Sequence, residues 1–589
     1  MAINKKTTTC AIAGALLLTT ALLAFFSTEN DSFTFDETAH IVAGYSYLTQ
    51  MDYRMNPEHP PLIKDLAAAP LLFLNLNFPK NDPIWTQASP AVWWHQFDLA
   101  VKFLYDSGND PDKILFWTRL PMIFVLILLG FFIFLWTKKL WGKKAGLIAL
   151  FLFAFFPTFL AHGRLVTTDI GAAFGAVFAT YFWLKFLKNT TKKSLIFAGL
   201  ALGTALLIKF SLILLLPFFA IITLVFAWLK NNGAEKFKNL TKYTGLAILT
   251  GIIGVVFVIW PVYGYNVAKY PQERQIKDTQ ELLDTTNTPD ALIKINIMLD
   301  SNPVTRPLGH YFLGLLTATN RTTTGNTTYF MGQVSADSWK SYFPIVYFIK
   351  NPLPFHILTL IALLYLLWFL LRQGFGEQVK NHFTEFSMLT FLIIYWTTSL
   401  ASNLNIGVRH LMPVFPFTIM LVSAATVHWL KEPLLKLKCA VLGILFLWQA
   451  ASVFSIYPHF IAYFNESIGG PDKGYLYVVD SNLDWGQDLK RLRDWLDQNL
   501  PAGRQVYLDY FGGGSPGYYL GEKYLAWSGT KKPEELPRGS YLAVSANQLQ
   551  GGRADRVKGY DKPADFYRWL DKYTPIAKIG YSIFVYKID

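Results

Sequence analysis

The sequence predicts an α-helical protein that crosses a membrane many times and carries a soluble α/β domain at its C-terminal end. Of the 589 residues, 52% are hydrophobic and only 16% are charged, whereas soluble domains carry about 25% charged residues. The lysines gather in short clusters between long apolar runs, as they do in the cytoplasmic loops of membrane proteins. After about residue 457 the long apolar runs stop and shorter alternating patterns begin.

Apolar runs long enough to cross a hydrocarbon core, which takes about 20 helical residues, recur up to residue 457. We expect the first run to stay as an anchor, because residues 24–27 form a poor signal-peptide cleavage site. The stretch 194–229 is too long for one span and is interrupted by Lys209 and Ser211, which favours two connected helices. The other runs lie near 10–26, 114–136, 145–161, 170–187, 244–263, 354–371, 386–401, 411–429 and 439–457.

The lysines also set the predicted orientation. If 194–229 forms two spans, the lysines between 230 and 242 lie inside with every other cluster. This gives eleven spans with the N-terminus inside and the C-terminus outside. We therefore predict a transmembrane module over 1–457, with large outer loops at about 28–113 and 264–353, and an extracytoplasmic domain over 458–589.

The tail has the patterns of a small α/β domain, with strand-like and helical segments in turn. Asp480, Asn482 and Asp484 alternate like the oxygen ligands of calcium. No acidic residue completes a calcium loop, so we expect Asp484 to cap a helix that begins near Gly486. The strand-like segments are 506–508 and 583–586, and the helical patterns lie near 486–497 and 563–573.

Ionisable side chains are costly at membrane depth, so the positions of those that flank the spans are informative. On the predicted topology, eight of them map to the outer edge of the membrane. Each alone has a structural explanation, such as a helix cap or a side chain that reaches the headgroups. Together they indicate a site where a carboxylate accepts a proton and cations hold a phosphate. The eight are Asp36, Glu37, Glu58, Arg119, Arg164, Asp169, Lys209 and Arg409.

This combination suits the transfer of a sugar from a lipid phosphate. A hydroxyl acceptor needs a positioned Asp or Glu to take its proton, and Arg and Lys stabilise the charge of a leaving phosphate. The sequence contains no phosphate-binding loop, dinucleotide-binding fingerprint or zinc signature. The net charge of +13 is explained by the lysine clusters between spans, so we expect no nucleic-acid partner.

Two motifs carry a family resemblance. Phe35-Asp36-Glu37-Thr38-Ala39-His40 follows the first span, and Pro57-Glu58-His59-Pro60-Pro61-Leu62 comes next. Together with 164–169, Lys209 and Arg409-His410-Leu411-Met412-Pro413, they resemble the GT-C fold glycosyltransferases of the protein O-mannosyltransferase and lipid A aminoarabinose transferase group, glycosyltransferase family 39-like. The resemblance covers the chain to about residue 430. The tail stretches 464–471 and 480–488 resemble other bacterial carrier-dependent glycosyltransferases.

The resemblance implies a membrane enzyme that transfers a hexose or pentose from a polyprenyl-phosphate donor, with inversion, in the cell membrane. It implies that Asp36 is the general base and that Glu37 orients a neighbour or the acceptor. Lys209 and Arg409 would contact the carrier phosphate. Arg119 and Arg164 would either help them or pair with local carboxylates.

The resemblance does not decide whether the site binds a divalent metal ion. Glu58 matches a glutamate near the metal of the aminoarabinose branch, whereas His59 and the prolines after it are closer to the mannosyltransferase pattern. Asp169 and His310 are further candidates for binding the acceptor or a metal, although a lone histidine beside aromatic residues is more often packed in the interior.

A lipid-linked sugar transporter or flippase is the main alternative class. Transporters place polar groups near the membrane midplane, whereas the charges here map to one face. The sequence leaves open the donor sugar and the acceptor, which is a protein hydroxyl or a glycan or lipid of the cell envelope.

Overall fold

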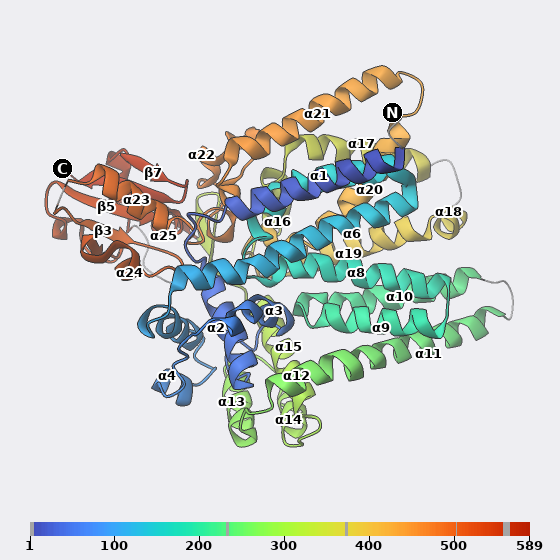
Figure 1. Ribbon diagram of the computed structural model, residues 1–589, viewed down its shortest axis with the longest axis horizontal. Helices are drawn as coiled ribbons and strands as arrows, with labels where there is room; N and C mark the ends of the chain where they lie inside the picture. Colours follow the sequence, from blue (N-terminus) through green and yellow to red (C-terminus); the bar gives the residue numbers. More distant parts are fainter. Residues whose placement is uncertain (1–4, 231–234, 371–374, 502, 558–565, 589) are drawn as a thin grey trace.

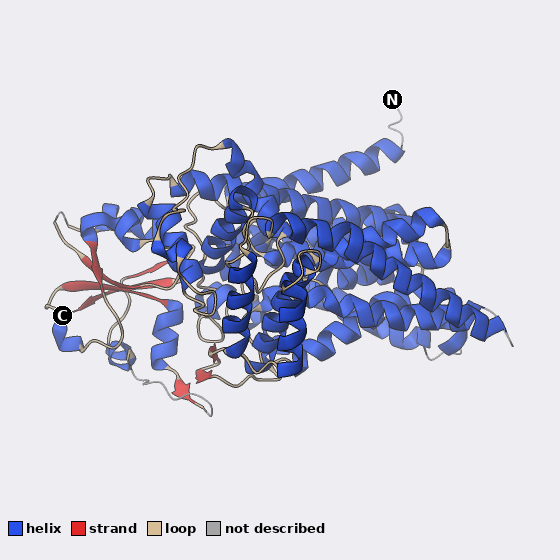
Figure 2. Ribbon diagram, turned by 90° about the horizontal axis from the view of Figure 1, so that it is seen from below, coloured by secondary structure: helices blue, strands red, loops and turns tan. Residues whose placement is uncertain are grey.

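The structure is a computed structural model that describes residues 5–230, 235–370, 375–501, 503–557 and 566–588. Long helices pack side by side, and a β-sheet lies at one end of them (Figures 1 and 2). The helices of this bundle are α1 (Lys5–Phe26), α6 (Pro111–Ala154), α7 (Pro157–His162), α8 (Thr168–Lys188), α9 (Lys192–Leu206), α10 (Leu215–Lys230), α11 (Glu235–Gly254), α17 (Leu353–Leu370), α18 (Phe375–Asn381), α19 (Phe383–Ala401), α20 (Val414–Trp429) and α21 (Leu435–Ile456).

The predicted apolar runs all fall on helices. The run 114–136 lies on α6, and the run 145–161 lies on the end of α6 and on α7. Between these runs Gly142, with φ 89°, breaks α6 into two halves. Gly130 in the first half packs against Phe153 in the second, so the two halves fold back on each other. Among the described residues, six helices are long and apolar enough to cross a membrane, or up to seven if α16 (Tyr342–Ile349) and α17, bent by 116°, count as one span. A polytopic helical protein is confirmed, and the number of eleven spans stays a prediction.

Two segments outside the bundle lie mostly below it in Figure 1, towards the end that carries the sheet. The first follows α1 and the second follows α11, over the ranges 28–113 and 264–353. That these ranges are outer loops stays a prediction. The first contains α2 (Phe35–Gln50), α3 (Leu62–Ala68), α4 (Pro83–Thr86) and α5 (His95–Val101). The second contains α12 (Trp260–Asn266), α13 (Gln272–Asp284), α14 (Asp290–Asp300), α15 (Arg306–Thr324), β1 (Thr328–Phe330), β2 (Gln333–Ser335) and α16 (Tyr342–Ile349).

The tail forms the predicted α/β structure. Its five-stranded sheet has the order β4-β3-β5-β8-β7, with β3 parallel to β4 and β5, and with β8 antiparallel to β5 and β7. Leu489, Leu492 and Leu496 form one face of α23 at helical spacing and pack against the sheet. The elements are α22 (Pro471–Gly474), α23 (Leu489–Asn499), β3 (Val506–Asp509), α24 (Pro516–Leu520), β4 (Tyr524–Ala526), β5 (Ser540–Ser545), α25 (Ala546–Arg553), β6 (Asp555–Arg556), β7 (Ala577–Ile579) and β8 (Ile583–Ile588).

Two expectations for the tail are wrong in detail. The helix expected from Gly486 begins at Leu489, and Asp484 accepts a bond from the Asn547 amide at 2.8 Å instead of capping it. The reason is tertiary, because Asp484 lies against α25, which comes far later in the chain. Of the helical pattern 563–573, the described part forms only a 3₁₀ turn over Arg568–Lys572, and residues 563–565 lie outside the described residues.

Candidate active site

Helix α2 begins with a capping box that separates the two acidic residues of its first turn. The Thr34 amide and hydroxyl both donate to Glu37, at 2.9 and 3.0 Å. Successive residues of a helix point about 100° apart. Glu37 is therefore fully buried, while the Asp36 side chain keeps 24% of its surface exposed and faces a cavity.

Glu37 is held by the bundle. The Arg119 guanidinium donates to both of its oxygens, at 2.9 and 2.6 Å, and the Val166 amide donates at 3.0 Å. Burial raises the pKa of a carboxyl, but Arg119 and the backbone donors outweigh it and lower the pKa of Glu37. These contacts fix the start of α2 against α6 and agree with a supporting role for Glu37.

A second buried cluster joins the tail to the bundle. Asp31 pairs with Arg164 and, at 2.8 Å, with Arg491 of α23, while Arg119 lies 3.7 Å away. The Ser32 amide and hydroxyl donate to the carbonyls of Gln487 and Gly486. Arg119 and Arg164 therefore pair with carboxylates and do not line the cavity, so they take the second of the two roles expected for them.

The cavity beside Asp36 has a volume of about 440 Å³. It lies between α2, α15 and the segments that precede α10 and α20. One part of its wall is apolar, with Ile213, Leu214 and Leu404 among its residues. The acidic, basic and histidine residues that line it are Asp36, His40, Glu58, His59, Lys209, Arg321, Arg409 and His410.

A chain of ion pairs crosses the cavity wall. Lys209 Nζ lies 2.5 Å from Asp169, and Arg409 lies 3.4 Å from the other oxygen of Asp169 and 2.9 Å from Asp36. Asp169 thus brings the two predicted phosphate-binding cations together. Lys209 lies between α9 and α10, Arg409 in the 3₁₀ turn Val408–Leu411, and Asp169 in the first turn of α8.

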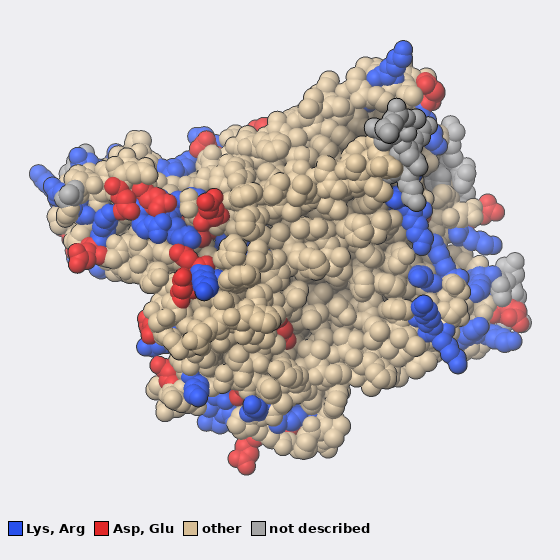
Figure 3. Space-filling view, in the orientation of Figure 1, with Lys and Arg blue, Asp and Glu red and all other residues tan. Residues whose placement is uncertain are grey.

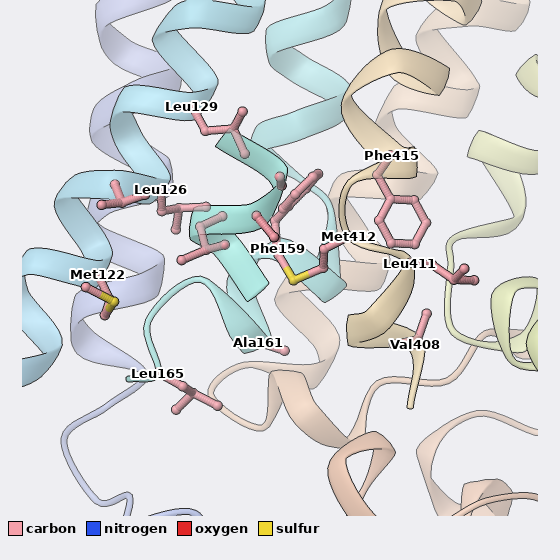
Figure 4. Close-up of a cluster of buried hydrophobic side chains, with 14 of the residues drawn as sticks. Met122, Leu126, Leu129, Phe159, Ala161, Leu165, Val408, Leu411, Met412 and Phe415 are labelled. Carbon is pink, nitrogen blue, oxygen red and sulfur yellow. The ribbon is translucent and has the colours of Figure 1, made fainter. Parts of the chain in front are cut away.

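Apolar packing fixes the backbone on either side of these charges. Leu165, next to Arg164, and Val408 and Leu411, which flank Arg409, belong to one buried cluster with side chains of α6 and α7 (Figure 4). Side chains in a close-packed interior have few alternative positions. The cluster therefore limits how far the Arg409 backbone can move from the cavity.

The tail segment 480–488 completes the support of Arg409. The Arg409 guanidinium lies 4.2 Å from the centre of the Trp485 ring, and its Nε donates to Ser481 at 3.1 Å. The Val408 amide donates to Asn482 at 2.9 Å. These contacts give the tail motif 480–488 a structural role.

Glu58 lines the cavity but is already engaged. Arg321 of α15 donates to one of its oxygens at 2.6 Å, and the Trp93 indole donates to the other at 3.0 Å. Burial raises the pKa of Glu58, but the Arg321 charge outweighs it and the pKa falls to about 2. Both carboxylate oxygens are thus committed within the protein.

The described residues contain no group of three or more His, Cys, Asp or Glu arranged to hold a metal ion. His59 lines the cavity, and burial and the nearby His40 hold its pKa well below the ordinary value. His310 is away from the cavity, packed among the rings of Tyr53, Tyr263 and Tyr270. With Glu58 engaged and His310 elsewhere, these residues do not fit the divalent metal site that the resemblance leaves open.

Sequence reasoning missed four residues of this site. Arg321 pairs with Glu58, and Arg491 with Asp31, across hundreds of residues, so no local pattern could reveal these two contacts. Asp31 precedes the first motif by only four residues and could have been found as a buried acid at the edge of a span. His410 follows Arg409 directly and belongs to a motif already singled out.

Part of the chain matches the model of a glycosyltransferase family. Residues 113–260 match the family model described as dolichyl-phosphate-mannose-protein mannosyltransferase. This match confirms the predicted resemblance to glycosyltransferases that use lipid-linked donors. The matched segment runs from α6 to α12 and includes Arg119, Arg164, Asp169 and Lys209. No curated protein sequence matches the chain.

Three solved structures are similar to the chain at low identity. The oligosaccharyltransferase AglB from Archaeoglobus fulgidus is 13% identical, with a TM-score of 0.47 over 92% of this chain and 70% of that one. ArnT from Cupriavidus metallidurans is 11% identical, with a TM-score of 0.45 over 98% and 97%. The Saccharomyces cerevisiae protein O-mannosyltransferase Pmt1-Pmt2 complex is 11% identical, with a TM-score of 0.47 over 78% and 90%.

Proposed function

We propose that this protein is a membrane glycosyltransferase that moves a sugar from a polyprenyl-phosphate donor to an acceptor hydroxyl on the extracytoplasmic face. The observation that carries the proposal is the juxtaposition in one cavity of an accessible carboxylate, Asp36, with two cations, Lys209 and Arg409. The description of the matched family, which names a dolichyl-phosphate-linked mannose donor, supports the same class of reaction.

Asp36 is proposed as the general base. It is the first-turn carboxylate of α2 that faces the cavity, whereas Glu37 is enclosed by Arg119, Thr34 and Val166. An incoming acceptor hydroxyl would hydrogen bond to Asp36 and lose its proton to it as the new glycosidic bond forms. Arg409, 2.9 Å from Asp36, holds this carboxylate at the edge of the cavity.

Lys209 and Arg409 are proposed to hold the carrier phosphate. A phosphate that enters the cavity would share these cations with Asp169, and their charge would stabilise the leaving phosphate as the sugar departs. The apolar part of the wall, which includes Ile213 and Leu214, suits the first isoprene units of the carrier. A charged headgroup site next to an apolar surface is the arrangement that a lipid phosphate requires.

The proposed orientation is supported by the charge distribution. Lys and Arg gather at the end of the bundle away from the tail sheet (Figure 3). Because cytoplasmic loops are rich in Lys and Arg, the cavity and the tail 458–589 are proposed to lie outside the cell membrane, beside the module 1–457.

The orientation can be tested by cysteine labelling in a variant in which Cys10 and Cys439 are replaced by serine. A membrane-impermeant maleimide should label Asp106→Cys in intact cells and should label Lys144→Cys only after the cells are permeabilised; both positions are exposed. The opposite labelling pattern would overturn the proposed face.

The reaction can be tested with the purified protein in lipid nanodiscs and a panel of polyprenyl-phosphate sugars. Mass spectrometry would follow the appearance of free polyprenyl phosphate and of glycosylated protein, glycan and lipid acceptors. Release of polyprenyl phosphate that depends on an added acceptor is expected. Movement of the lipid-linked sugar across vesicles without any transfer would instead identify a flippase.

A further inference from the structure

A second cavity, of about 270 Å³, lies between the tail sheet and the β1–β2 hairpin. It shares no residue with the cavity at Asp36. Its volume is near the lower end of the range of about 300–1,000 Å³ that small-molecule sites occupy. It therefore has room for one small ligand.

The position of this cavity in the sheet is one where α/β folds bind ligands. β3 and β5 are parallel neighbours at the centre of the sheet. After β3 the chain forms β4 on one side of this pair, and after β5 it continues to β8 on the other side. Such a switch point leaves a crevice at the carboxyl ends of the strands. Asp509 is the last residue of β3, and Asn547 and Gln548 follow β5 directly; all three line the cavity.

The lining is polar, and it has no Lys or Arg among its described residues. Asp509 is held in place by the Gly529 amide at 3.0 Å and by the Tyr567 hydroxyl at 2.5 Å. A lone carboxylate without a cation repels phosphates and other anions. The side-chain amides and hydroxyls, among them Ser528 and Thr530, instead match a neutral ligand with many hydroxyl groups.

Aromatic rings complete the wall. Tyr329, Phe566 and Tyr567 line the cavity beside these polar groups. Gly529 and Gly552 pack against the Tyr567 ring, which a Cβ at either position would approach to 2.9 Å. An apolar ring face next to carboxylate and amide groups suits a sugar ring, which has C–H groups on its faces and hydroxyls around its edge.

A short piece of chain connects the two cavities. Arg321 and Thr323, in the last turn of α15, line the cavity at Asp36, and Thr327 lines the second one. Four residues of chain span at most about 14 Å. The hairpin is also fixed to the tail, because β2 pairs with β6 and Phe330 bridges to Val478. A glycan of a few sugar units would therefore reach from one cavity to the other.

We propose that the second cavity is a subsite for a neutral sugar unit of the acceptor, so that the acceptor is a glycan that extends along the tail. The inference rests on the proposed function. Asp509 would accept hydrogen bonds from the sugar hydroxyls and Gln548 would donate to them, while the half-buried Phe566 would contact a ring face. The reacting hydroxyl, on another unit of the same glycan, would lie at Asp36.

Gly551 allows the cavity to be blocked without a clash. It lies in α25 and lines the cavity, and a Cβ there would meet no atom within 4 Å. Gly551→Leu therefore places an isobutyl group at the edge of the cavity. Gly517→Leu is a matched control, because Gly517 is also helical, has open space around it and lies outside the cavity.

Binding of simple glycosides to the full chain would be measured by saturation-transfer NMR. The protein would be in phosphatidylcholine nanodiscs, because glycoside detergents would compete with the probes for the cavity. The probes are the methyl glycosides of glucose, mannose, galactose and N-acetylglucosamine. We expect at least one to bind the wild type and Gly517→Leu equally, and to bind Gly551→Leu at least tenfold more weakly. Absence of binding by all four, or equal affinity of the two variants for every glycoside, overturns the subsite.

This binding readout separates the inference from the proposed function. If the contrast between the variants appears but no donor yields transfer, the cavity binds a sugar, while the proposed function fails and with it the acceptor role of the cavity. If transfer occurs without the contrast, the proposed function stands and the subsite fails. When both hold, Gly551→Leu should raise KM at least tenfold for glycan acceptors of several units and leave kcat within twofold.

Discussion

Glu37→Gln should destabilise the protein strongly, although the two side chains have almost the same shape. Glu37 accepts five hydrogen bonds, from Thr34, Arg119 and Val166, and it is fully buried. An amide can offer only one oxygen to these donors. Its NH₂ group would face donors, and Arg119 would lose its nearest carboxylate and keep only Asp31, 3.7 Å away.

Breaking a buried ion pair by removing one partner costs about 3–5 kcal/mol. We expect Glu37→Gln to lower the free energy of unfolding by this amount in a denaturant titration followed by circular dichroism. The exposed Glu29 provides a control, and Glu29→Gln should change the stability by less than about 0.5 kcal/mol. The double variant Glu37→Gln, Arg119→Met removes both charges and should lose less stability than the sum of the single variants.

The same variants distinguish a supporting role from a chemical one. If Glu37 only fixes α2, sugar transfer by Glu37→Gln should fall in proportion to the folded fraction. Stability like that of Glu29→Gln together with a loss of transfer of a hundredfold or more would refute this reasoning, because Glu37 would then take part in the reaction.

Three further predictions follow from the contacts of the described residues. The pKa of Asp31 is lowered to about 2, since its arginines outweigh the effect of burial. Ionised Asp31 should therefore contribute about 2 kcal/mol to the free energy of unfolding above about pH 4, and this contribution should be lost as the pH falls towards 2. The stability of Asp31→Asn should lack this dependence on pH. Lys209→Met should weaken the binding of undecaprenyl phosphate at least tenfold, measured in nanodiscs, and an unchanged Kd would contradict its role. A Cβ on Gly513 would lie 2.5 Å from the Thr34 carbonyl oxygen, so Gly513→Val should expose the tail to limited proteolysis and reduce transfer, while Gly517→Val should do neither.

The helices of the bundle could be predicted because their signal is local. Every predicted apolar run lies on a helix, and the division at Lys209 follows from one lysine in an apolar stretch. The strands at 506–508 and 583–586 were likewise found from their alternation. These features depend on residues that are close together in the sequence.

The candidate site was predicted only in part, because its geometry comes from contacts between distant segments. Asp36, Lys209 and Arg409, which the pattern grouped, line one cavity, and their roles stay a prediction. It could not tell that Arg164 faces Asp31, or that Glu58 is occupied by an arginine 263 residues away. Adjacent acids in a helix differ in burial through tertiary packing, which leaves no local trace.

The tail shows the same limit. Its motif at 480–488 was visible, but its role was not, because Ser481 and Trp485 act on Arg409, more than 70 residues earlier in the chain. Asp484 looked like a helix cap because the cap pattern considers only residues that follow within a few positions. The second cavity depends on the strand order, which the sequence does not reveal.

The central claim is that Asp36 is the base of a sugar transfer, and Asp36→Asn tests it most directly. The purified variant would be assayed with a lipid-linked donor and an acceptor found active with the wild type, alongside its binding of undecaprenyl phosphate. We predict a rate lower by about 10²–10⁴-fold, the usual contribution of a general base, with binding of the carrier phosphate within threefold of the wild type. A rate within threefold of the wild type would contradict the assignment of Asp36.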